Sequence, residues 1–137
     1  MAGVGQEVIK SVLNREFGSQ TEAPGGTHYY ALMSTMPTSG GGGVEASGGT
    51  GPYARVSKAN DATRYPTIST GTTEKYLAEA VTFSGLPAGT WKGFAIYDAS
   101  TGGNLIAFAT FTAGDITTVS GDSIVLPANT GVVIQLA

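Results

Sequence analysis

Cysteine is absent from this sequence and histidine occurs once, as His28, which excludes several kinds of functional site. Without cysteine there is no disulfide framework, no thiolate zinc site and no cysteine nucleophile. A serine triad needs a histidine beside its nucleophile, and His28 begins an apolar segment, the usual setting of a structural histidine. The carboxylates of Asp98, Asp115 and Asp122 stand singly beside turns, where such side chains bond nearby backbone amides. We therefore expect no enzymatic activity, no metal and no cofactor.

Charge is also scarce, since only 12% of the residues are charged against roughly 25% in an ordinary soluble domain. The seven lysines and arginines are scattered and the net charge is −3, so no basic stripe could bind a nucleic acid backbone. No run of about 18 apolar residues could span a bilayer. The start, MAGVGQEVIK, lacks the basic and apolar blocks of a secretory signal. We expect a protein made in the cytoplasm, with neither nucleic acid nor membrane as a partner.

Glycine, in contrast, is abundant, with 21 of the 137 residues, about twice its usual share of roughly 7%. The length suits one domain over residues 1–137, and a hydrophobic share of 41% suits a real core. Short apolar segments alternate with turns and predict strands at 27–35, 52–57, 79–84, 91–98, 104–112, 116–119, 123–126 and 132–136. Their spacing predicts an all-β fold, an antiparallel β-sandwich over residues 27–137. The segment 104–112 is apolar on both faces, so its second face needs cover from a helix, a loop or another subunit.

The N-terminal segment, residues 1–18, has a different pattern. Its apolar residues recur at helical spacing: Val4, Val8, Ile9, Val12, Leu13 and Phe17. The spacing predicts a short amphipathic helix over about residues 5–17, ending near Gly18. Two roles remain open for this helix: it covers one end of the β core as a lid, or it docks as an arm on another subunit.

The stretch TSGGGGVEASGGTGPYARV, residues 38–56, is the richest in glycine. It lacks the Lys-Ser or Lys-Thr pair and the following helix that a phosphate-binding loop requires. Too little chain precedes it for a separate domain. We predict a long exposed loop over residues 38–52, because loops longer than about 12–15 residues are usually functional or disordered. It either stays mobile or becomes ordered on a neighbouring subunit.

Several motifs in this order resemble a known family. They are EASGG at 45–49, YAR at 53–55, IYDASTGGNL at 96–105 and the Gly121-Asp122 pair. The chain resembles a group of small virion proteins of tailed bacteriophages, labelled tail fibre proteins and, in some phages, capsid cement proteins. The resemblance covers about residues 28–137, although two extra residues separate the paired glycines from Tyr53. It implies a jelly-roll-like sandwich, a trimer and no catalytic residues.

Our leading hypothesis is a homotrimeric capsid cement protein that lies on the outer surface of the virion head and bridges major capsid proteins. A compact domain of low charge suits this role, whereas a tail fibre usually has an elongated shaft of repeats or coiled coil. The residues expected at the partner interface are Val4, Val8, Val12, Gly41, Gly42, Val44, Glu45, Gly49, Tyr53 and Arg55.

Two other hypotheses stay open. The chain could be a receptor-binding module of a tail fibre or tail tip, which holds a host glycan through Tyr65, Tyr76 or Trp91. Alternatively, Glu74 and Glu79 could form the acid pair of a glycan-cleaving enzyme.

Overall fold

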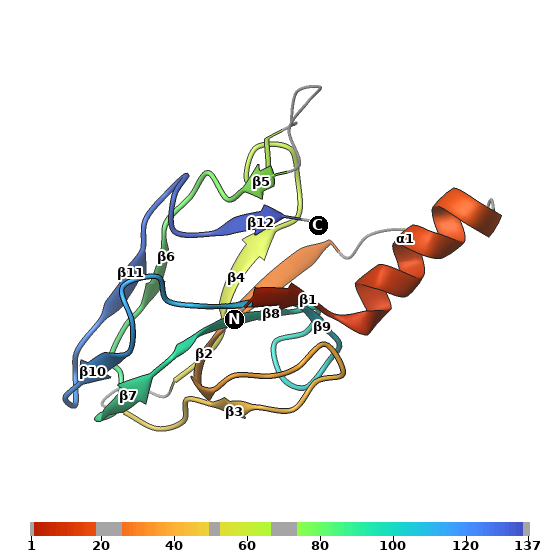
Figure 1. Ribbon diagram of the computed structural model, residues 1–137. Helices are drawn as coiled ribbons and strands as arrows, with labels where there is room; N and C mark the ends of the chain where they lie inside the picture. Colours follow the sequence, from red (N-terminus) through yellow and green to blue (C-terminus); the bar gives the residue numbers. More distant parts are fainter. Residues whose placement is uncertain (1, 19–25, 50–52, 67–73, 136–137) are drawn as a thin grey trace.

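The computed structural model describes residues 2–18, 26–49, 53–66 and 74–135, and Figure 1 shows their arrangement. The fold is mostly β, with antiparallel sheets and one N-terminal helix, as predicted. In chain order the elements are β1 (Ala2–Val4), α1 (Gln6–Gly18), β2 (Thr27–Thr35), β3 (Val44–Glu45), β4 (Val56–Ala59), β5 (Glu74–Tyr76), β6 (Val81–Phe83), β7 (Gly89–Trp91), β8 (Gly93–Tyr97), β9 (Leu105–Thr110), β10 (Ile116–Thr118), β11 (Ile124–Leu126) and β12 (Val133–Gln135).

One layer is a six-stranded sheet in the order β1-β9-β8-β2-β3, with β4 also paired to β2. The strands β3 and β4 therefore share one edge of β2, one after the other along its length. β2 carries the sequence THYYALMST, whose aromatic and β-branched residues favour an extended backbone that is packed on both sides. This strand is the centre of the fold, because it pairs with three others.

The second layer is a long two-stranded ribbon that the chain forms in three short ladders, β7–β10, β6–β11 and β5–β12. Trp91 lies opposite Ile116 and Phe83 opposite Ile124. The first two ladders keep one register, because both strands advance by eight residues between these pairs. The third ladder is shifted by two residues, which the segment 127–132 takes up.

The main core lies between the sheet and the ribbon. The sheet contributes Tyr30, Leu32 and Ile96, and the ribbon contributes Phe83 and Trp91, among others. A jelly roll has eight strands in two sheets, whereas here a six-stranded sheet faces a two-stranded ribbon. The jelly-roll topology implied by the resemblance is therefore not shown.

The predicted strand 91–98 is divided into two elements. At Lys92 the chain passes from the ribbon into the sheet: the Lys92 amide donates to the Met33 carbonyl, and the Lys92 carbonyl accepts from Phe111. In one regular strand Trp91 and Phe94 would lie on opposite faces. The break at Lys92 instead brings both into the main core.

The opposite face of the sheet is also apolar, as predicted. It buries Ala31, Met33, Ala95, Leu105 and Phe108. Met36 and Tyr97 pack against this cluster, whereas α1 contributes no buried residue. The second face is thus covered in part by Met36, just after β2, and by Tyr97, at the end of β8.

Candidate functional site

Three of the predicted interface residues, Glu45, Tyr53 and Arg55, form one hydrogen-bonded group, which we call the clasp. Glu45 Oε1 accepts from the Tyr53 hydroxyl at 3.0 Å and from Arg55 Nε at 2.9 Å, while Oε2 accepts from Arg55 Nη2 at 2.9 Å. The Arg55 side chain is 7% exposed and that of Glu45 27% exposed. The ion pair is therefore largely shielded from solvent, and its two-point geometry fixes both side chains.

Arg55 also holds the turn between β8 and β9. Its Nη1 donates to the backbone carbonyls of Ala99 and Gly102, both at 2.8 Å. Its guanidinium carbon lies 3.9 Å from the centre of the Tyr97 ring, a favourable cation–π distance. Burial by itself lowers the pKa of Arg55, but the hydrogen bond and charge of Glu45 raise it, and the net shift is upward. Arg55 is therefore always charged, and it links Glu45 in the glycine-rich segment 38–52 to the turn between β8 and β9.

Tyr53 fills a gap on the edge of β2. Its hydroxyl accepts a hydrogen bond from the backbone N–H of Leu32 at 2.9 Å, while the Leu32 carbonyl accepts from Ala46 at 2.9 Å. Burial raises the pKa of Tyr53, which the Leu32 hydrogen bond only partly offsets. The hydroxyl therefore stays protonated and donates to Glu45.

The turn that Arg55 grips has its own side-chain support. Asp98 Oδ1 accepts from the Asn104 backbone N–H at 2.7 Å, and Oδ2 accepts from Asn104 Nδ2 at 3.0 Å. Gly103 has a φ of 76° and lies against Asp98 and Ala99, so this position needs a residue without Cβ. The turn thus accounts for Asp98, Gly103 and Asn104 in the sequence DASTGGN.

The base of α1 is tied to the sheet and to the glycine-rich segment. The Gly5 amide donates to the Ile106 carbonyl at 2.7 Å and the Gln6 amide donates to the Ser39 carbonyl at 3.0 Å. Gly5 approaches the backbone of Leu105 so closely that a Cβ could not be accommodated. These contacts fix the point at which the helix leaves the sheet.

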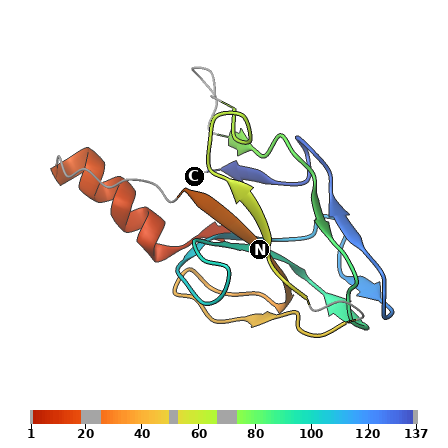
Figure 2. The same ribbon diagram turned by 180° about the vertical axis from the view of Figure 1, so that it is seen from behind.

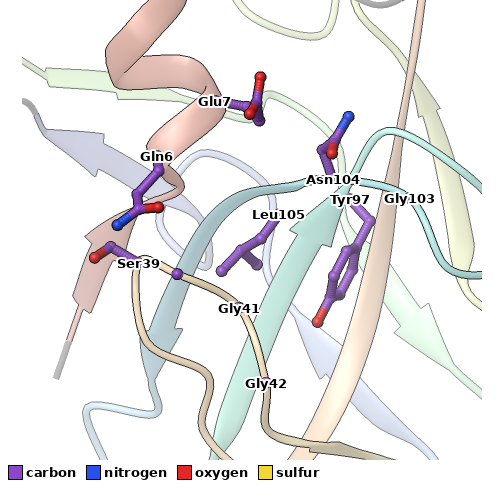
Figure 3. Close-up of a pocket in the computed structure, with 10 residues that line it drawn as sticks. Gln6, Glu7, Ser39, Gly41, Gly42, Tyr97, Gly103, Asn104 and Leu105 are labelled. Atoms are coloured by element: carbon purple, nitrogen blue, oxygen red, sulfur yellow. The ribbon is translucent and has the colours of Figure 1, made fainter.

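A cavity of about 260 Å³ lies at this junction. Figure 3 shows Gln6 and Glu7 on the helix side and Tyr97 and Asn104 on the sheet side, with the turn at Gly41 completing the rim. Segments that are far apart in the sequence therefore meet around a polar cavity.

The helix itself extends away from the strands, as both views show (Figures 1 and 2). Ile9 is 45%, Leu13 51% and Phe17 86% exposed, and no residue of α1 is buried. The interpretation of this helix as a lid over the β core is therefore wrong, because it covers none of the core. Docking on another subunit stays a prediction.

The chain matches a known family over residues 5–133, which includes the helix, the clasp and nearly all of both layers. The family is described as "Podophage GP4 fiber I protein gp80". This chain belongs to that family. It is accordingly a fibre protein of a bacteriophage virion, a structural component and not an enzyme, as the sequence predicts. No curated protein matches the chain significantly.

The gp80 family membership agrees with the expected virion role and favours a fibre over a capsid cement. Of the predicted interface residues, the clasp residues come together, and Gly41 and Gly42 line the cavity at the helix base. Val44 is exposed on β3, and Gly49 is also exposed. Their contact with a partner stays a prediction, as it does for Val4 on β1 and for Val8 and Val12 on the helix.

The predicted loop 38–52 is partly tied down. Val44 and Glu45 pair with β2, and Thr38 and Gly41 exchange two backbone hydrogen bonds in a tight turn. Residues 50–52 lie outside the described part of the chain. The motifs at 53–55 and 96–105 do not reveal that Arg55 contacts Tyr97, Ala99 and Gly102, because only the fold brings these segments together.

Two of the aromatic residues proposed to bind a glycan cannot do so. Tyr65 and Trp91 are buried: the Tyr65 hydroxyl lies 2.6 Å from that of Tyr30, and Trp91 Nε1 donates to Thr118. Tyr76 is partly exposed on β5. The enzyme hypothesis is wrong for a gp80 family member, and Glu79 is paired with Lys58 and Arg64 at 3.1 Å.

The described residues contain no group of three His, Asp or Glu side chains that could hold a metal ion. Within the same residues no helix has the length and apolar content needed to cross a membrane.

Proposed function

We propose that this chain is a compact subunit of the phage tail fibre and attaches to neighbouring subunits through α1. The observation that carries the proposal is the family match over residues 5–133, which includes α1. The exposed apolar side of α1 supports it, since such surfaces usually mark sites of interaction with other proteins.

The capsid cement hypothesis, with the major capsid protein as partner and a place on the outer head surface, receives less support. A fibre family name favours the tail. The absence of shaft repeats and coiled coil does not oppose this role, because a compact module can belong to a longer assembly if it has an attachment point. We propose α1 as that point.

Within the fibre, we propose that the partners are further copies of this chain, as a homotrimer. Val8 and Val12 on α1, together with Val44 on the edge strand β3, are the apolar candidates for the contact. Because Glu45 and Arg55 bind each other, we assign them the role of holding this edge in place.

Labelling of intact particles tests the proposal. An antibody against this protein, with gold-conjugated secondary antibody, should label the tail in electron micrographs, and particles assembled without the protein serve as the control. Label distributed over the head would overturn the fibre role and restore the cement hypothesis.

A second candidate function is recognition of a host glycan by the fibre. The cavity at the helix base favours it, because Gln6, Glu7 and Asn104 offer amide and carboxylate groups beside Tyr97, the mixture of polar and aromatic groups that orients a small ligand. A glycan array should detect binding by the wild type and lose it in Gln6→Ala. Equal binding by the variant, or no binding by either, would reject this candidate.

A further inference from the structure

Among the described residues, none buries the apolar side of α1. Its exposed residues, Ile9, Leu13 and Phe17, lie near Val8 and Val12 on a helix without any buried residue. A helix of 13 residues is marginal in water without packing, because isolated helices shorter than about 12–15 residues rarely hold together. A contact beyond the described strands would therefore stabilise it.

The helix cannot fold back to find that contact on its own sheet. β1 precedes it directly and pairs with β9, with Ala2 opposite Ala109 and Val4 opposite Ala107. At the other side of this joint Gly5 and Gln6 donate to Ile106 and Ser39. The direction of α1 is thus set by the backbone hydrogen bonds of β1, of Gly5 and of Gln6, its first residue.

An apolar groove lies elsewhere on the same chain. It is a cavity of about 540 Å³, and we call it the β9–β11 groove. Its lining includes Phe111, Ile116, Ile124, Val125 and Val133. None of the described residues that line it is charged. Val125 is 54% and Val133 46% exposed, so the groove lacks a complete cover of its own.

We propose that α1 of one copy inserts its apolar side into the β9–β11 groove of a second copy. Complementarity supports this partner: a mainly aliphatic stripe would meet a groove without charges, and both would lose contact with water. In Figure 1, α1 and β11 lie on opposite sides of the molecule. The two surfaces therefore suit a head-to-tail contact between copies.

The area that a stable contact needs favours a groove over a symmetric pair of helices. At about 1.5 Å per residue and about 10 Å in width, α1 presents a strip of roughly 200 Å² in projection. A stable interface buries about 800 Å² on each partner. A groove contacts more of the helix surface than one flat side does, so it brings the contact closer to that area.

A contact between two different surfaces of the same chain is heterologous. Such contacts close into a ring, a trimer included, or continue as a filament. The inference rests on the proposed function in one respect: it takes α1 as the element that attaches one subunit to the next.

Crosslinking of cysteine variants tests the pairing directly, because the chain has no natural cysteine. Leu13→Cys and Val125→Cys are prepared separately, mixed, and treated with a short bis-maleimide. We expect a crosslinked dimer in the mixture, at least about fivefold above a mixture of Leu13→Cys with Ser100→Cys, whose exposed cysteine lies in the β8–β9 turn. No excess over that control would overturn the proposal, and so would equal crosslinking of Leu13→Cys alone, which indicates helix against helix.

A second variant separates assembly from folding. Leu13→Glu places a charge in the apolar stripe and should reduce the mass measured by light scattering to that of a monomer. Ser11→Glu is the matched control, because at about 100° per residue it lies on the opposite side of the helix from Ile9 and Leu13. Both variants should keep the wild-type melting temperature of the strands, since α1 buries nothing in the core. Unchanged mass for Leu13→Glu would overturn the proposal, whereas tail labelling of particles would still test the fibre role separately.

Discussion

The hydroxyl of Tyr53 accepts the backbone N–H of Leu32 at 2.9 Å, at a position where a neighbouring strand would normally supply a carbonyl. The strands β3 and β4 both pair with this edge of β2. The pairing of β4 ends at Tyr30 and that of β3 at Met33, so neither strand offers a backbone carbonyl to the Leu32 N–H. A side chain thus completes the ladder between two edge strands. Tyr53 meets β2 through its side chain and not its backbone, so the strand predicted at 52–57 begins only at Val56.

Tyr53→Phe should therefore destabilise the fold. The substitution keeps the ring but removes the acceptor for Leu32 and the donor to Glu45. A buried N–H without a partner costs about 1–3 kcal/mol, and we expect a loss of this size in the free energy of urea unfolding. Tyr76→Phe, on a partly exposed ring, is the control and should change it by less than about 0.5 kcal/mol. Equal effects of the two substitutions would contradict the role assigned to Tyr53.

Arg55→Met should cost more than Tyr53→Phe. It leaves the Glu45 carboxylate without its cation and removes both hydrogen bonds to the β8–β9 turn. Breaking a buried ion pair by removing one partner costs about 3–5 kcal/mol, and the partial exposure of Glu45 points to the lower end. Lys92→Met breaks the half-exposed pair with Asp115 and should cost at most about 1 kcal/mol. Urea unfolding of both variants makes the comparison, and similar losses would show that the clasp is no stronger than a surface pair.

Much of the fold could be predicted because local patterns decide it. The strand 27–35 and the helix follow from apolar spacing, and each agrees with the structure within one residue. The two-residue strand β3 was missed because its sequence, Val44-Glu45, has no pattern of its own and becomes a strand only through pairing with β2. The break at Lys92 was missed for a similar reason, since hydrogen bonds to distant residues decide it.

The clasp was predicted only in part. Glu45, Tyr53 and Arg55 were singled out for their motif, but as surface residues for a partner. Sequence spacing does not reveal that Arg55 is 7% exposed or that its guanidinium reaches carbonyls in another turn. A motif that combines an acid, a tyrosine and an arginine with two glycine-rich turns fits an internal network as well as a binding surface, and only the fold distinguishes them.

Gly5→Ala should loosen the base of the helix without unfolding the core. A methyl group at this position would overlap the Leu105 backbone, and backbone cannot move aside as a flexible side chain can. A local cost of about 1.4 kcal/mol or more would increase the opened population about tenfold, so trypsin should cleave at Lys10 and Arg15 about tenfold faster. Gly40→Ala, with ample space around its Cβ position, is the control. An unchanged cleavage rate in Gly5→Ala would contradict this account of the helix base.

Acidification should weaken the fold through His28. Its Nδ1 lies 2.9 Å from the Tyr65 hydroxyl, and burial lowers the pKa of this imidazole from its ordinary value of 6.5. Between the lowered folded pKa and 6.5 the unfolded chain binds more protons, so stability rises with pH in this window. The contribution is complete above pH 6.5 and is lost as the pH falls from 6.5 through the folded pKa.

Urea unfolding at about pH 7.5 and about pH 5.5 measures this loss, because histidine is the side chain that normally titrates in this interval. The wild type should have the lower free energy of unfolding at the more acidic pH. His28→Gln retains a polar group that can meet Tyr65 but cannot take up a proton, so it should show a smaller drop. An equal drop in the variant would assign the acid sensitivity to other groups, since His28 would then titrate alike in the folded and unfolded chains.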